Sequence, residues 1–261
     1  MSEVEYVATG AVAVITLRRP EARNAVNPAL AAGLEAAIDA LEADAALRVG
    51  ILRADTEGQS RPVFCAGADL KVVEQTGSAT SLDTARGGFG GLAFRERSKP
   101  IVAAVDGLAT AGGLELVLAC DIVVASTRAS FGLAEVRRNL VAAAGGLYRL
   151  PRAVGRATAM DMILTGEPID AGRAHALGLV SRLVDPADVD AEAMRVAEAI
   201  VAAAPVAVQE SRRAVNLAAS EPDDAMRVAT RAMLDALLES EDTAEGLRAF
   251  AEKRPPEWKG R

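Results

Sequence analysis

Glu115 stands alone as an acidic residue in an otherwise apolar run, Leu114–Cys120, and Gly112 and Gly113 precede it. A carboxylate is rarely buried without a partner unless it has a task. The first amides of a helix lack internal acceptors. A helix that begins at these glycines could therefore hold developing negative charge while Glu115 handles a proton or a water molecule.

A second turn of small residues reads Cys65-Ala-Gly-Ala-Asp-Leu-Lys71. Gly67 and Ala68 let a ligand approach the backbone closely, and Asp69 can cap the helix that follows. Taken alone, a tight turn without any ligand explains this segment equally well. Together with Gly112, it predicts an oxyanion hole made of two backbone amides.

Glu135, in the segment Phe131-Gly-Leu-Ala-Glu-Val-Arg-Arg138, is a second candidate acid. Taken alone, an exposed glutamate paired with Arg137 or Arg138 is the more ordinary interpretation. The small residues Ala142–Gly146 downstream could line one wall of a site.

The elements that must position these residues alternate between strand and helix. Asn27 and Pro28 are typical of a helix start, and apolar spacing carries that helix to about residue 43. Residues 74–91 are rich in Gly, Ser, Thr and Ala, which predicts a mobile loop and a short helix. Further helices are expected over 143–150, 155–164 and 170–177, and strands over 11–17, 49–54, 62–66, 100–105, 122–125 and 180–184.

Strand patterns stop at about residue 189, and three or four amphipathic helices follow. We therefore expect an α/β core over residues 1–188 and a C-terminal helical region over 189–261.

Composition excludes several classes of function. The net charge of −7 argues against general affinity for nucleic acid. No apolar run reaches the length of a membrane span, and the N-terminus shows no secretion signal, so we expect a cytoplasmic protein with no membrane partner. One histidine, His175, and two cysteines, Cys65 and Cys120, argue against a metal site and against a Ser-His-Asp triad.

Two glycine-rich segments resemble nucleotide-binding motifs only in spacing. Gly88-Phe-Gly-Gly-Leu-Ala93 matches G-x-G-x-x-A, but the preceding Ser81–Arg86 is polar and helical in character rather than a strand. Gly107–Gly113 has the spacing of a P-loop but lacks its Lys and Ser/Thr.

In combination, the motifs resemble the enoyl-CoA hydratase/isomerase (crotonase) family. They are Ala66-Gly-Ala-Asp-Leu70, Asp106-Gly-x-Ala-x-Ala-Gly-Gly-x-Glu-Leu116, Cys120-Asp-Ile122 and Phe131-Gly-x-x-Glu135. The resemblance extends over nearly the whole chain. It implies a spiral of β-β-α turns followed by helices that mediate assembly into a trimer or a dimer of trimers.

The resemblance also implies roles for residues. The amides of Ala68 and Gly112 would bind the thioester oxygen of an acyl-CoA, and Glu115 and Glu135 align with the two catalytic glutamates of hydratases. Coenzyme A would be part of the substrate, so no separate cofactor is expected. Residues expected to contact the substrate or its CoA part are Ala66, Gly67, Asp69, Leu70, Lys71, Arg23 and Gly113.

The activity that follows is hydration of a 2-trans-enoyl-CoA. Two departures from the family pattern bear on the pocket: Ala142 begins Ala-Ala-Ala-Gly-Gly where hydratases often carry Pro-Gly-Ala-Gly-Gly, and Ala111 replaces a frequent glycine. Enoyl-CoA isomerisation and dehydration of a specialised hydroxyacyl-CoA remain alternatives, as does a non-catalytic CoA-binding protein. The acyl group is not defined, so fatty-acid β-oxidation, sterol side-chain breakdown and secondary metabolism all stay open.

Overall fold

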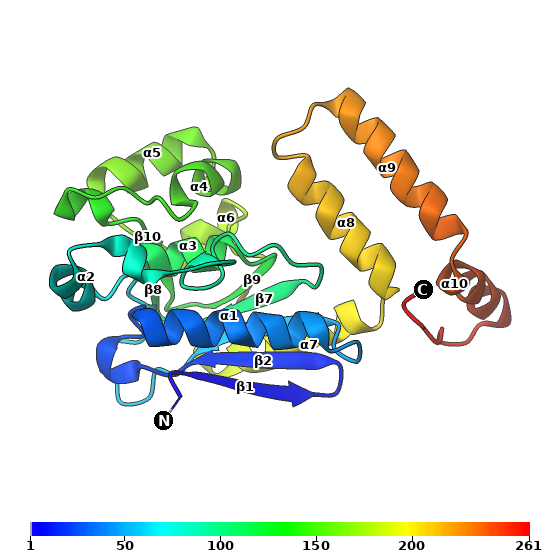
Figure 1. The fold of residues 1–261 in the computed structure, drawn as a ribbon, viewed down its shortest axis with the longest axis horizontal. Helices are drawn as coiled ribbons and strands as arrows, with labels where there is room; N and C mark the ends of the chain where they lie inside the picture. Colours follow the sequence, from blue (N-terminus) through cyan, green and yellow to red (C-terminus); the bar gives the residue numbers. More distant parts are fainter. Residues whose placement is uncertain (1) are drawn as a thin grey trace.

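The computed structural model describes residues 2–261, and its core is built on two sheets of mixed α/β architecture (Figure 1). The larger sheet has the order β1-β2-β3-β7-β9-β12. Its first pair is antiparallel, and the other neighbours are parallel. The strands are β1 (Val4–Thr9), β2 (Val12–Leu17), β3 (Val49–Ala54), β7 (Ile101–Val105), β9 (Ile122–Ser126) and β12 (Arg182–Val184).

The smaller sheet has the order β11-β10-β8-β4. It consists of β4 (Val63–Cys65), β8 (Leu108–Thr110), β10 (Ser130–Gly132) and β11 (Ile169–Asp170). The chain repeatedly passes from a strand of the large sheet to one of the small sheet and then into a helix. The three passes are β3-β4-α2, β7-β8-α3 and β9-β10-η3, where α2 is Leu70–Thr76, α3 is Gly112–Leu118 and the 3-10 helix η3 is Glu135–Arg138. This repetition confirms the expected β-β-α spiral, and it places the three candidate segments at equivalent points.

Helices cover both faces of the large sheet. α1 (Pro28–Ala43) begins as predicted, because the Asn27 side chain accepts a hydrogen bond from the Leu30 amide at 2.8 Å. Leu30, Leu34 and Ile38 turn inward and join the main core. On the opposite face α7 (Val189–Val201) packs against the sheet through Val189, Ala193, Val196 and Ala197.

The remaining helices are α4 (Gly146–Val154), α5 (Arg156–Thr165) and α6 (Ala171–Ala176) in the core, then α8 (Pro205–Leu217), α9 (Asp223–Leu238) and α10 (Glu241–Glu252). We call α8–α10 the arm, because these helices project away from the core (Figure 1). Within the described chain α8 buries no residue and α9 buries only Met233. The assignment of residues 189–261 to oligomerisation stays a prediction, and α7 at its start belongs to the packing of the sheet.

The structure adds strands that the sequence pattern did not predict. β1 is an edge strand with only Val4 buried, and β8 and β10 are three residues each, too short to show alternation. The helical interpretation of Ser81–Arg86 is wrong. A 3-10 helix (Ala79–Leu82) gives way to a small hairpin of β5 (Asp83–Thr84) and β6 (Gly88–Phe89). Across residues 2–261, no helix combines the length and apolarity needed to cross a membrane.

Candidate active site

Glu115 is buried within the first turn of α3, with 4% of its surface exposed. One of its oxygens accepts a hydrogen bond from the Gly146 amide at 2.9 Å, at the start of α4. Burial raises the pKa of Glu115 to about 7, opposed by the Gly146 amide and assisted by the charge of Glu135. The carboxyl can therefore exchange a proton near neutral pH, as a general acid or base requires.

The turn into α3 holds its backbone in an uncommon conformation. Ala111 has φ of 52° and ψ of −131°, and its amide donates to the Gly132 carbonyl of β10 at 2.9 Å. Among the described residues, the amides of Gly112 and Gly113 have no acceptor. Gly113 must be glycine, because a Cβ there would overlap the Cys65 carbonyl. Its contact with a substrate stays a prediction.

The Ala66–Asp69 turn brings a second free amide beside Gly112. Val26 donates to the Gly67 carbonyl at 2.7 Å and accepts from the Asp69 amide at 2.8 Å. The intervening Ala68 amide is left without an acceptor within residues 2–261. Gly67 has φ of 85°, and a Cβ built on it would lie 2.8 Å from the Gly112 nitrogen. The two small-residue turns predicted as a pair therefore lie in contact.

Glu135 begins η3, and two residues separate it from β10, the strand to which Ala111 is bonded. It is half-buried, and its Oε2 atom is inaccessible and lacks a hydrogen-bond partner in the described part of the chain. Burial raises its pKa, and the nearby Arg138 charge opposes that rise. The pairing considered from sequence is not formed, since Arg137 instead bonds Thr165 and Glu167.

The residues expected to contact CoA differ in whether they are exposed or already bonded within the fold. Lys71 and Leu70 are exposed at the start of α2, and the Asp69 side chain caps that helix by accepting from the Lys71 amide at 3.2 Å. Asp69 also pairs with Arg19 at 3.2 Å, so that arginine is engaged within the fold. Arg23 lines a cavity of about 930 Å³ together with Arg61 and Arg128.

Three features of the site escaped the sequence analysis. Gly146 was expected only as part of a wall, and its amide reaches Glu115 across 31 residues, a separation that no local pattern encodes. The strain at Ala111 is visible only in its dihedral angles. Phe89 lies against Gly112, since a Cβ on that glycine would overlap its ring, and its only sequence signal was the glycine-rich segment set aside as a false nucleotide motif.

The remaining polar residues of the sequence analysis lie outside this chemistry. His175 is exposed and its Nδ1 contacts the Val180 carbonyl at 2.9 Å. Both cysteines are free, and burial raises the pKa of Cys65 to about 12, which leaves its thiol protonated and unreactive.

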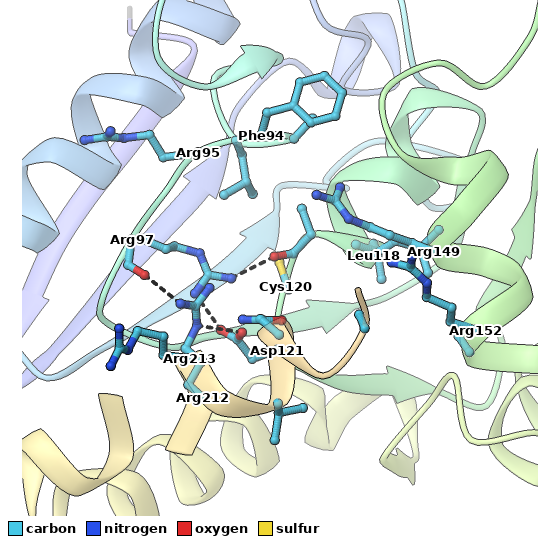
Figure 2. A pocket seen from close by; sticks show the side chains of 18 of the residues that line it. Phe94, Arg95, Arg97, Leu118, Cys120, Asp121, Arg149, Arg152, Arg212 and Arg213 are labelled. Carbon is cyan, nitrogen blue, oxygen red and sulfur yellow. Dashed lines mark hydrogen bonds and ion pairs between the residues drawn. The ribbon is translucent and has the colours of Figure 1, made fainter. Parts of the chain in front are cut away.

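A cavity of about 1260 Å³ lies at the other end of α3, between the core and α8. Its lining includes Val117–Asp121 but neither Glu115 nor Glu135. Figure 2 shows Asp121 between two arginines; it pairs with Arg97 at 2.6 Å and with Arg212 of α8 at 2.8 Å. This cavity belongs to the junction of arm and core rather than to the glutamates.

Comparison with known proteins decides the family. The family described as enoyl-CoA hydratase/isomerase matches residues 8–261. The chain belongs to the enoyl-CoA hydratase/isomerase family. It is 38% identical to (E)-benzylidenesuccinyl-CoA hydratase of Thauera aromatica, over 95% of this chain and 96% of that one. It is 37% identical to carnitinyl-CoA dehydratase of Proteus mirabilis (strain HI4320), with both chains fully covered.

A solved structure of this family has the same fold. Enoyl-CoA hydratase from Mycobacterium tuberculosis H37Rv superposes with a TM-score of 0.92 at 41% identity, over the whole of both chains. The crotonase fold implied by the motifs is thereby confirmed.

Proposed function

We propose that this member of the enoyl-CoA hydratase/isomerase family is a hydro-lyase that adds water reversibly to a 2-trans-enoyl-CoA and forms a 3-hydroxyacyl-CoA. The observation that carries the proposal is the placement of Glu115. A buried carboxyl with a pKa of about 7 lies one turn inside a helix whose first amides are free, and Glu135 is close enough to influence its charge.

The reaction follows from these parts. Water forms a bond to the β-carbon, and the π electrons of the double bond move toward the thioester oxygen to give an enolate. The amides of Ala68 and Gly112 receive that charge, and each such donor is worth about 3 kcal/mol in comparable sites. One glutamate takes a proton from the water, and the α-carbon receives a proton from the other as the enolate collapses. Glu115 and Glu135 can hold these roles in either order. In both cases the pair returns to its starting protonation state by exchanging protons.

The CoA part of the substrate would bind along the Ala66–Asp69 turn, which supplies one amide of the oxyanion hole. Lys71 supplies an exposed cation beside Ala68. The Arg23 carbonyl accepts from the Ala66 amide at 3.1 Å, so Arg23 offers a second cation at the start of the same turn. Ala66, Gly67 and Leu70 would contact the chain between the thioester and the phosphates. CoA is the carrier of the substrate in this proposal, and no further cofactor takes part.

We test the proposal with Glu115→Gln and Glu135→Gln, which keep shape and remove the acid. Each should lower the kcat for crotonyl-CoA hydration by at least about 100-fold, the contribution expected of a positioned acid or base, whereas binding of a CoA thioester persists. Loss of the enoyl absorbance reports turnover, and calorimetry reports binding. Glu57→Gln on an exposed loop is the matched control and should keep full activity. Full hydratase activity in either active-site variant would overturn the proposal.

Dehydration of a hydroxyacyl-CoA is the second candidate, favoured by the similarity to carnitinyl-CoA dehydratase. It uses the same groups in the reverse direction. Product analysis after incubation with 3-hydroxyacyl and 3-enoyl thioesters shows whether the enzyme favours dehydration, isomerisation or hydration. A chain that binds CoA thioesters but converts none of them would instead be a non-catalytic binding protein.

We further propose assembly as a homotrimer or a dimer of trimers, and the exposed surface of the arm supports association between copies. The arm leaves large apolar side chains exposed in a single copy, with Phe250 exposed to 86%. Others on the same three helices are Val215, Val228, Leu234, Leu238 and Leu247. Such surface on a projecting element marks a protein interface.

A further inference from the structure

The glycine-rich segment that resembled a nucleotide motif forms a hairpin packed between α1 and α3. Gly88, Gly90 and Gly91 all have positive φ, and a Cβ on Gly91 would overlap the backbone of α1 at Ala31. A Cβ on Gly90 would lie 3.0 Å from the Leu116 side chain of α3. The glycines thus let this hairpin, residues 83–91, approach both helices more closely than other residues could.

One carboxylate on α1 fixes the hairpin. Glu35 accepts hydrogen bonds from the Thr84 hydroxyl at 2.6 Å, the Gly87 amide at 2.8 Å and the Arg86 amide at 3.1 Å. These bonds, led by that from Thr84, lower the pKa of Glu35 and keep it charged at neutral pH. Asp39, one turn further along α1, pairs with Arg95 at 2.7 Å just beyond the hairpin. The segment expected to be a mobile loop is therefore tied down at its tip.

The tied hairpin places the ring of Phe89 directly against the oxyanion hole. A Cβ on Gly112 would overlap the Cε1 and Cζ atoms of that ring and would lie 3.4 Å from the Gly67 α-carbon. Gly112 is thus held between the Ala66–Asp69 turn and Phe89. The ring is half-buried, so part of its surface is not covered by the core.

We propose that Phe89 is a specificity-determining residue that restricts the enzyme to acyl groups unbranched at the α-carbon. The inference rests on the proposed function, because it takes the thioester oxygen to lie at the Ala68 and Gly112 amides. The α-carbon is bonded to the same carbonyl carbon as that oxygen, so a substituent on it lies within a few ångströms of the hole. A methyl group there meets the Phe89 ring, and the hairpin cannot withdraw without breaking the Glu35 hydrogen bonds.

The test compares kcat/KM for crotonyl-CoA and for its α-methyl analogue, 2-methylcrotonyl-CoA, in matched variants. The wild-type enzyme should prefer crotonyl-CoA by at least about 10-fold, the discrimination that one methyl group commonly gives. Phe89→Ala should raise the ratio of kcat/KM for the analogue to kcat/KM for crotonyl-CoA by about 10-fold or more. Phe89→Leu should shift the ratio in the same direction by less.

Phe94→Ala is the control, since Phe94 lies in the same segment and packs on Gly88 and Arg149 rather than on Gly112. It should leave the ratio unchanged. Glu35→Ala tests the positioning role and should raise the ratio as Phe89→Ala does, with Glu35→Gln restoring much of the wild-type preference. Equal rates on both thioesters in the wild-type enzyme, or an unchanged ratio in both Phe89 variants, overturn the inference. Absence of hydration with either thioester overturns the proposed function instead.

Discussion

At the scale of single residues, the burial that suits Glu115 to proton transfer also lowers the stability of the protein. The pKa of Glu115 rises from 4.5 to about 7 because burial disfavours the charged form, and this effect outweighs the opposing Gly146 amide and Arg149 charge. Had Glu115 been a salt-bridged core residue, its pKa would have fallen and its loss would have damaged the fold. The protein instead retains a carboxyl that costs stability whenever it is ionised.

We therefore expect Glu115→Gln to stabilise the fold in a pH-dependent way. Below pH 4.5 both folded and unfolded states hold the proton, and the charge penalty is absent. As pH rises from 4.5 toward 7, the unfolded state loses the proton while the folded state keeps it, so wild-type stability falls. Above pH 7 the variant should be more stable by about 3 kcal/mol, the free energy of a shift of this size. Urea unfolding at pH 5 and pH 8 measures the difference. A gain at pH 8 no larger than at pH 5 would contradict the prediction, and Glu57→Gln should show no gain at either pH.

The residue scale also shows what the sequence could predict. Burial of Glu115 followed from its apolar neighbours, and the Asp69 and Asn27 caps followed from local chemistry that a helix start requires. The Glu115–Gly146 bond and the approach of Phe89 to Gly112 depend on tertiary packing between distant segments. Local spacing carries no information on such contacts.

At the scale of elements, the three β-β-α passes explain why the site lies where it does. Each pass ends in a short turn off the small sheet, and β4, β8 and β10 are neighbours in that sheet. The turns bearing Ala68, Gly112 and Glu135 therefore emerge side by side. The sequence revealed the helices and most of the longer strands. It missed the edge strand β1, which buries only Val4, and it missed β8 and β10, because three residues are too few for a periodic pattern.

The backbone conformation of the turn into α3 leads to a prediction about stability. Ala111 has φ of 52° and ψ of −131°, a region that costs a residue with a Cβ about 1–3 kcal/mol. Ala111→Gly relieves that strain and loses about 0.4–1 kcal/mol through the freer unfolded chain, so we expect a net gain of about 1 kcal/mol. Hydratase activity should persist, because the Gly112 amide is unchanged. Chemical denaturation measures the gain. The buried Ala109→Gly in β8, where the backbone is extended, should destabilise the protein, and a loss of stability in Ala111→Gly would show that the turn is not strained.

At the scale of the whole molecule, the arm is joined to the core by few contacts, and α8 buries no residue against it. One is the cluster of Arg97, Asp121 and Arg212 in Figure 2. The Arg97 side chain is only 1% exposed, and Arg212 also donates to the Arg97 carbonyl at 2.6 Å. Burial and the Arg97 charge lower the pKa of Arg212, so Asp121 is the anion that makes this arrangement tolerable.

Asp121→Asn should consequently destabilise the junction by about 3 kcal/mol, since removal of one partner leaves buried charge uncompensated. The two guanidinium groups would repel one another, and α8 should become more susceptible to limited proteolysis. Asp235→Asn, which breaks an exposed pair with Arg231 on α9, should cost less than about 1 kcal/mol. Unfolding curves for both variants give the comparison, and equal effects would show that the cluster of Arg97, Asp121 and Arg212 has no special role.

The exposed apolar side chains of the arm have a consequence for how the stability of the protein is defined. If the arm is covered only when copies associate, the free energy that covers Phe250 and its neighbours enters through mass action rather than through folding of one chain. The unfolding temperature then belongs to the protein at a stated concentration, and the same chain is less stable in dilute solution than at high protein concentration.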